Sequence, residues 1–142
     1  MAACTFFGHR DSPDSIFPKL QNSIEGLILS QNASSFYVGN QGRFDALVLK
    51  ALRGLKPNHP GINYYVVLAY LPEKQMIYEP EETLFPEGLE TVPRRFAITH
   101  RNRWMVDRSD FVIAALQRDF GGAAEAVRYA KNRGKVVIAC GE

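Results

Sequence analysis

Two consecutive glycines, Gly121 and Gly122, stand between a short apolar run and a stretch rich in alanine, residues 123–130. A strand, a glycine pair and a helix in this order direct the unpaired N–H groups of the first helical turn at one position, where the helix dipole favours negative charge. Because glycine has no Cβ, a phosphate can also come close to the backbone there. The pattern predicts a phosphate or nucleotide site at the start of this helix.

A second glycine-containing loop carries side chains that suit the same ligand. Gly8, His9 and Arg10 directly follow an apolar run near the N-terminus. Arginine can bind a phosphate through two parallel hydrogen bonds, and histidine can bind a ribose or phosphate oxygen. The alternative is a surface loop in which Arg10 only pairs with the neighbouring Asp11.

A third loop contains Gly39, Asn40 and Gly42, and Asp45 follows it at the start of a helical pattern. Asn40 or Asp45 could hold the hydroxyl groups of a ribose. For Asp45 the alternative is a carboxylate that only complements the dipole of its own helix, which contributes about 0.3–1 kcal/mol.

A basic segment, residues 94–108, supplies the candidate cations for the anion. It contains five arginines, of which we expect Arg101 and Arg103 to bind the ligand; the alternative is a solvated helix face. Trp104 of this segment and Tyr78 could stack on a base, although single aromatic residues more often lie in a core.

Glu125 lies about one turn into the helix that follows the glycine pair. It either binds the free amides of its own first turn or acts on a ribose as an acid–base group.

Strands must position these loops, and the sequence predicts strands that alternate with helices. Apolar runs that are continuous rather than alternating are typical of strands covered on both faces. The strands are expected at residues 3–7, 36–38, 62–71, 111–116 and 136–139, and the helices at 12–30, 43–55, 94–108 and 121–133. The pattern predicts one α/β domain over residues 1–142, with a Rossmann-like, doubly wound, mainly parallel five-stranded sheet and helices on both faces.

The three glycine-containing loops each follow a predicted strand, so they are expected at one edge of the sheet. Ligands of such sheets bind outside the carboxyl ends of the strands, near the point where the strand order reverses. Residues 72–93 contain four prolines and no visible period. They are expected to form a long loop, which is either a functional lid or a solvated excursion without a role.

Composition limits the remaining possibilities. The chain has 142 residues, 46% hydrophobic, and a net charge of +2, which is too small to argue for nucleic acid or an anionic membrane. Neither a signal peptide nor a membrane span is expected. Cys4 and Cys140 have no metal-ligand spacing and are expected to be reduced and buried, so we expect a cytoplasmic protein without metal or cofactor.

Four segments together resemble the SLOG superfamily, and most closely its small YpsA-like bacterial proteins. They cover residues 4–10, 36–42, 101–105 and 121–124, in the order of that superfamily and over nearly the whole chain. The resemblance implies a Rossmann-like domain that binds nucleotides or nucleotide-derived ligands, and often a homodimer or higher homo-oligomer. Members include the LOG phosphoribohydrolases, the DNA-processing protein DprA, and sensor domains for ADP-ribose-type signals.

The resemblance to the LOG enzymes is incomplete. Arg101, Met105 and Asp110 match their arginine, methionine and aspartate, and the glycine pair matches as well. However, Asn102 replaces a lysine, Phe120 a proline and Ala124 a glycine, while Glu125 stands at a threonine. Arg128 occupies the position of the catalytic glutamate, and an arginine cannot stabilise an oxocarbenium-like transition state as a carboxylate does.

We therefore expect a sensing or regulatory domain that binds a nucleotide or an ADP-ribose-like ligand. The alternative is a phosphoribohydrolase that cleaves the N-glycosidic bond of nucleoside monophosphates, with Arg101 and Glu125 as its catalytic residues. Binding of single-stranded DNA, as in DprA, is disfavoured by the small net charge.

Overall fold

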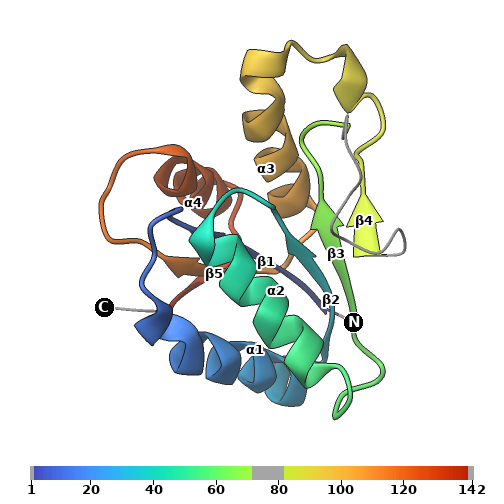
Figure 1. The fold of residues 1–142 in the computed structure, drawn as a ribbon, viewed down its shortest axis with the longest axis vertical. Coiled ribbons are helices and arrows are strands. Elements are labelled where there is room, and N and C mark those ends of the chain that lie inside the picture. The colour runs from blue at the N-terminus through green and yellow to red at the C-terminus, as the bar shows by residue number, and fades with distance from the viewer. Residues whose placement is uncertain (1, 72–81, 141–142) are drawn as a thin grey trace.

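A single six-stranded sheet forms the centre of the protein. The computed structural model describes residues 2–71 and 82–140. All strand pairs are parallel, and the strand order is β4-β3-β2-β1-β5-β6 (Figure 1). The strands are β1 (Ala2–Gly8), β2 (Ala33–Val38), β3 (Asn63–Val67), β4 (Thr83–Leu84), β5 (Phe111–Ala115) and β6 (Val136–Ala139).

Helices cover both faces of the sheet. The α-helices are α1 (Phe17–Gln31), α2 (Arg43–Leu55), α3 (Ala97–Asp107) and α4 (Gly122–Asn132), and short 3₁₀ helices span Asp14–Ile16, Leu89–Thr91 and Arg94–Phe96. Helices α1 and α2 lie on one face, and α3 and α4 lie on the other (Figure 1). This arrangement confirms the Rossmann-like α/β fold that the alternating pattern predicts.

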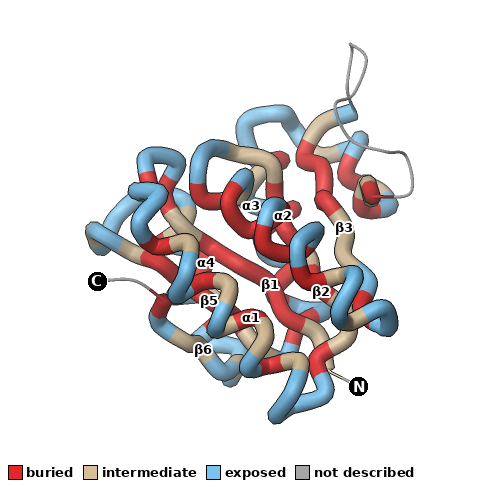
Figure 2. The backbone as a smooth tube through the Cα atoms, turned by 60° about the horizontal axis from the view of Figure 1, so that its bottom comes forward, coloured by how far each residue is buried: buried red, intermediate tan, exposed pale blue. Residues whose placement is uncertain are grey.

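The core has two layers because alternate residues of each strand point to opposite faces. Phe6 of β1 and Ile113 of β5 pack under α1 and α2, whereas Phe7 and Val112 pack under α3 and α4. Figure 2 shows β1 as a largely buried strand that runs through the middle of the molecule. Such strands are covered on both sides, which explains why their sequences are continuously apolar.

The strand order reverses beside β1. From β1 the chain adds β2 and β3 on one side, and it later returns to place β5 and β6 on the other side. The loops that follow β1 and β5 therefore lead to helices on opposite faces of the sheet, which leaves a crevice between them. The β1–β5 boundary is the position at which this fold class binds ligands.

The structure corrects the prediction of a five-stranded sheet, because residues 83 and 84 of segment 72–93 form a sixth strand. Residues 72–81, including Tyr78, lie outside the described residues. Thr83 of strand β4 pairs with Val66 of β3, and the N–H of Leu68 donates to the carbonyl of Leu84 at 2.8 Å. A strand of two residues has no period to read, and its pairing partner lies far back in the sequence. Correspondingly, β3 ends at Val67 rather than at the predicted residue 71.

Helix α3 begins later than predicted. Residues Arg94–Phe96 form a separate 3₁₀ turn before α3 begins at Ala97. Phe96, the last residue of this turn, is 46% exposed.

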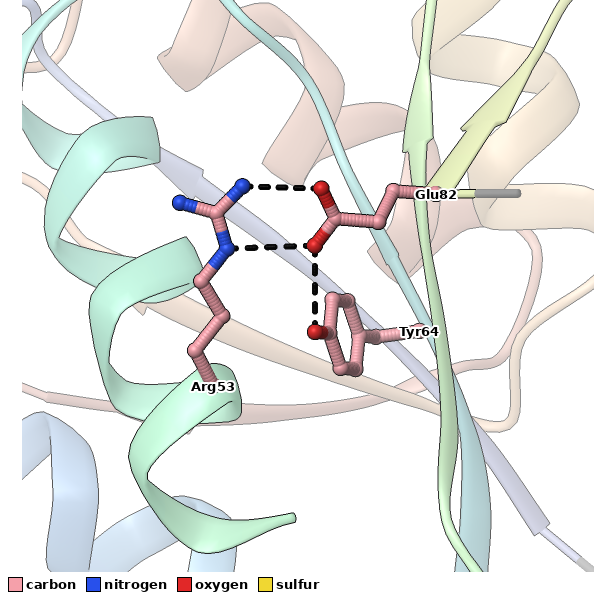
Figure 3. Close-up of polar contacts among 3 residues, drawn as sticks. All are labelled: Arg53, Tyr64 and Glu82. Carbon is pink, nitrogen blue, oxygen red and sulfur yellow. Dashed lines mark hydrogen bonds and ion pairs between the residues drawn. The ribbon is translucent and has the colours of Figure 1, made fainter. Parts of the chain in front are cut away.

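A charged network holds the β4 edge of the sheet to α2. Arg53 donates to both carboxylate oxygens of Glu82, at 3.1 and 2.8 Å, and the hydroxyl of Tyr64 donates to the same carboxylate at 3.1 Å (Figure 3). Burial and the hydrogen bond to Glu82 raise the pKa of Tyr64. The network compensates for a short strand pairing, since β4 has only two residues.

Replacing Glu82 with glutamine is expected to lower the free energy of unfolding by about 1.5–3 kcal/mol, the typical contribution of hydrogen bonds to charged groups. Urea denaturation followed by circular dichroism measures this loss. Glu87→Gln serves as the matched control, because Glu87 is exposed on the same segment, and its effect should stay within about 0.5 kcal/mol. Equal effects of the two substitutions would contradict a stabilising role of the network.

Candidate ligand-binding site

A cavity of about 380 Å³ lies at the carboxyl end of the sheet, where the loops after β1, β2 and β5 meet α3 and the start of α4. We call it the central cavity. Its volume lies within the usual range for small-molecule sites. Most of the residues that the sequence predicts as ligands line it: Gly8, His9, Arg10, Gly39, Asp45, Arg101, Gly121 and Gly122.

Arg101 forms the deep, positively charged part of the central cavity. Arg101 is only 2% exposed, and its Nε donates to Oδ1 of Asn102 at 2.9 Å. Its Nη1 donates to the carbonyl of Val67 at 2.9 Å and lies 3.5 Å from Oδ1 of Asn40. These contacts fix the guanidinium between α3, the end of β3 and the loop after β2. Burial lowers the pKa of Arg101, and the Asp45 charge opposes that shift.

Asp45 is the carboxylate that faces this arginine. Burial raises the pKa of Asp45, while the hydrogen bond from the N–H of Gln41 and the charge of Arg101 act in the opposite direction. Gly39 makes the approach possible, because a Cβ at that position would lie 2.9 Å from Oδ2 of Asp45 and 3.0 Å from Cζ of Arg101. The pair gives the cavity both an anion-binding group and an acceptor for hydroxyl groups.

His9 is buried, with 5% of its surface exposed, and it lines the same cavity. Its Nε2 is a buried side-chain nitrogen without a hydrogen-bond partner among the described residues. Its backbone carbonyl accepts hydrogen bonds from the N–H and the hydroxyl of Ser12, at 3.1 and 2.8 Å. A buried polar atom without a partner is costly, which makes His9 a candidate ligand-binding residue of this cavity.

Close packing holds the loops after β1 and β2 together. The N–H of Arg43 donates to the carbonyl of Arg10 at 2.9 Å. Gly42 has φ +113°, and a Cβ there would lie 2.2 Å from Cβ and 2.5 Å from Cα of Arg10. Gly8 likewise packs on the ring of Phe44, which a Cβ would meet at 2.2 Å. Because Gly8 and Gly42 have no Cβ, the loops after β1 and β2 can pack closely and form one wall of the cavity.

Helix α4 begins at the edge of the central cavity. Gly121 is its N-cap residue, with φ +95°, and no side chain caps the helix. A Cβ at Gly121 or Gly122 would meet no heavy atom within 4 Å, so open space lies in front of the first helical turn. The amides of this turn are suited to bind an anion.

Some of the predicted residues lie elsewhere. Asn40 and Gly42 line a neighbouring cavity of about 340 Å³, the side cavity, which shares Gly39 and Asp45 with the central one. Arg103 and Glu125 line a small cavity of about 30 Å³ between α3 and α4.

Four further residues named in the sequence analysis have structural partners. The guanidinium of Arg103 lies 5.0 Å from the centroid of the Tyr129 ring. Arg128 donates to the carbonyl of Asp119 at 2.9 Å. Asp110 accepts a hydrogen bond from the N–H of Ala3 at 3.0 Å, at the end of the sheet opposite to the cavity. Trp104 packs edge-on against the ring of Tyr37, with 5.5 Å between centroids.

Arg118 and Phe120 also line the central cavity, although the sequence did not predict them as ligands. The guanidinium of Arg118 donates to the carboxylate of Asp11 at 3.1 and 3.4 Å, which links the loops after β5 and β1. These hydrogen bonds lower the pKa of Asp11. Both residues lie between a predicted strand and the glycine pair, and this position in the loop could have indicated that they line the site.

Metal and membrane sites receive no support from the described residues. Within 2–71 and 82–140, no group of three or more His, Cys, Asp or Glu side chains is placed to hold a metal ion. None of the helices in this part of the chain has the length and apolar character that a membrane crossing requires. Cys4 and Cys140 are free and buried, and burial raises the pKa of both thiols.

The fold and the position of the cavity define a Rossmann-like domain with its candidate site at the reversal of strand order. Among solved structures, the chain is similar to DNA processing protein A (DprA) from Streptococcus pneumoniae, with a TM-score of 0.72 and 16% sequence identity. The similarity covers 98% of this chain and 50% of that protein, so the chain spans about half the length of its structural neighbour. No family model and no curated protein matches the sequence. The similarity establishes a fold related to that of DprA.

Proposed function

We propose that this domain binds a nucleotide or an ADP-ribose-like ligand in the central cavity and serves a sensing or regulatory role. The observation that carries the proposal is the unpartnered, buried Nε2 of His9, which lines the same cavity as Arg101 and the uncapped start of α4. A ligand phosphate would satisfy these groups together. Asp45 would accept hydrogen bonds from a ribose.

Thermal denaturation with AMP, NAD and ADP-ribose tests the proposal. A ligand at about 100 times its Kd should raise the free energy of unfolding by about 2.7 kcal/mol, which is a shift of several degrees in Tm. His9→Phe is the informative variant, because it removes the unpartnered nitrogen and keeps a ring in its place. We expect it to match or exceed the wild type in stability without ligand and to bind at least tenfold more weakly.

Two outcomes would contradict the proposal. If none of these compounds shifts the Tm of the wild-type protein, nucleotide binding fails. If His9→Phe binds as tightly as the wild type, the ligand lies elsewhere than the central cavity.

The hydrolase alternative has less support. Glu125, its candidate acid–base residue, is exposed and lines the small cavity with Arg103 rather than the central cavity. Release of free base from nucleoside monophosphates, abolished by Glu125→Ala, would favour the hydrolase over the sensor.

DNA binding is a third alternative, because the structural neighbour is a DNA processing protein. A single-stranded oligonucleotide that competes with ADP-ribose would favour it.

A further inference from the structure

Phe120 is an unusual member of the central cavity. Phe120 is 64% exposed, and yet it lines the same cavity as Arg101, which is 2% exposed. Phe120 therefore lies at the rim of the cavity, and Arg101 lies deep within it. Because burial of a phenylalanine ring is favourable, a ring left this exposed beside a cavity gains most from a ligand that covers it.

The backbone around Phe120 is held in place from both sides. The residue before it, Asp119, accepts a hydrogen bond from Arg128 of α4 at 2.9 Å. The residue after it, Gly121, is the N-cap of α4. The guanidinium of Arg118, itself bound to Asp11, lies 5.7 Å from the centroid of the Phe120 ring. Phe120 thus directly precedes the first turn of α4, the proposed phosphate position, and lines the same cavity as that turn.

The lining of the cavity combines cationic and apolar groups. Arg101 and His9 are buried in it, and Phe120 and Ile98 contribute apolar surface from the loop after β5 and from α3. This distribution suits a ligand with an anionic part and a flat aromatic part. Aromatic side chains bind bases by stacking without regard to base identity, because every base has a π face.

We propose that Phe120 stacks on the aromatic base of the ligand and so selects base-containing ligands over simple sugar phosphates. The inference rests on the proposed function and adds to it both the residue that binds the base and the location of the base at the rim. Because stacking reads the face and not the edge of the base, Phe120 would favour bases as a class.

Isothermal titration with AMP, ADP-ribose and ribose 5-phosphate tests this inference on the full chain. The variants are Phe120→Ala, Phe120→Leu, which keeps apolar bulk without aromaticity, and Phe120→Tyr, which keeps the ring. Phe120→Ala is expected to weaken the binding of AMP and ADP-ribose about tenfold, with Phe120→Leu close to it and Phe120→Tyr within about twofold of wild type. Binding of ribose 5-phosphate should change less than about twofold in all three variants, and Tm without ligand should stay constant.

The outcomes separate this inference from the proposed function. If the wild-type protein binds ribose 5-phosphate as tightly as AMP, the result supports the phosphate site but contradicts stacking on the base. Equal losses for AMP and ribose 5-phosphate in Phe120→Ala, or unchanged AMP binding in Phe120→Leu, also overturn it. A Phe120→Ala variant that changes only the oligomeric state assigns the ring to a contact between copies instead. If the wild type binds none of the three compounds, the proposed function fails and the inference fails with it.

Discussion

Replacement of Gly42 by alanine is expected to lower the free energy of unfolding by about 2–6 kcal/mol, the sum of backbone strain and overpacking. Gly42 has φ +113°, which a side-chain-bearing residue rarely adopts. A Cβ would also lie 2.5 Å from the backbone Cα of Arg10, and a backbone atom cannot move aside as the end of a flexible side chain can. The loss is large against the 5–15 kcal/mol that stabilise a typical domain.

Two other glycines separate the causes of this loss. Gly121 has φ +95° with open space around it, so Gly121→Ala should show only the strain, about 1–3 kcal/mol. Gly26 lies within α1 with nothing within 4 Å, so Gly26→Ala should stabilise the protein by about 0.5–1 kcal/mol. Urea denaturation of the three variants should rank Gly42 as the most costly position. If Gly42→Ala cost no more than Gly121→Ala, the loops after β1 and β2 would not pack as described.

Gly42→Ala should also weaken ligand binding, because the loop after β1 carries His9 and the loop after β2 leads into the first turn of α2, which carries Asp45. Without denaturant and at a temperature well below its Tm, the Gly42→Ala protein should bind ADP-ribose at least tenfold more weakly than the Gly26→Ala protein. Unchanged affinity would mean that the spacing of the two loops does not shape the site.

Much of the fold could be predicted because its elements have strong local signals. Helix α2 was predicted at residues 43–55 and is observed at Arg43–Leu55, since Gly42 marks its start and its apolar residues recur at helical spacing. Strand β4 could not be found in this way, because it exists through pairing with β3 and through the Arg53–Glu82 contact, both of which are long-range.

The candidate site was predictable in outline for a topological reason. Parallel strands end at one edge of the sheet, so the three glycine-containing loops had to lie near one another. Which side chains enter the cavity depended on helix rotation. Arg101 and Arg103 are two residues apart, and residues at that spacing face different sides of a helix, so both could not line one cavity. Arg101 faces the central cavity, and Arg103 lies beside Tyr129.

Arg101 carries the second large expected effect. Arg101→Met keeps much of the side-chain volume but removes the donor to the carbonyl of Val67, a buried residue. A buried carbonyl without a partner costs about 1–3 kcal/mol, and the loss of a positive charge near Asp45 adds to this. We expect a total loss of about 2–4 kcal/mol at neutral pH, together with loss of ligand binding. Arg103→Met, an exposed position on the same helix, should lose less than about 1 kcal/mol.

The loss caused by Arg101→Met should depend on pH, and the dependence has a definite sign. Burial raises the pKa of Asp45 above its ordinary value of 3.8, and the charge of Arg101 limits that rise. Without the arginine, the pKa of Asp45 in the folded state is expected to rise further. A carboxyl with a higher pKa in the folded than in the unfolded state binds more protons when folded, so stability falls as pH increases. The destabilisation should therefore be smallest below the folded-state pKa of Asp45 in the wild type and should grow until the pH exceeds the higher folded-state pKa in the variant.

The substitution Asp45→Asn tests whether this charge coupling operates. Asparagine has no charge to leave unbalanced, so Arg101→Met should cost less in the Asp45→Asn background, and its remaining cost should be independent of pH. Because the two side chains face each other, a double-mutant cycle at neutral pH should give a coupling of about 0.5–3 kcal/mol. A cost of Arg101→Met that is the same at every pH and in both backgrounds would show that Arg101 stabilises the fold only through its hydrogen bonds. In that case Asp45 would not compensate the positive charge of Arg101, and that charge would be free to bind an anionic ligand.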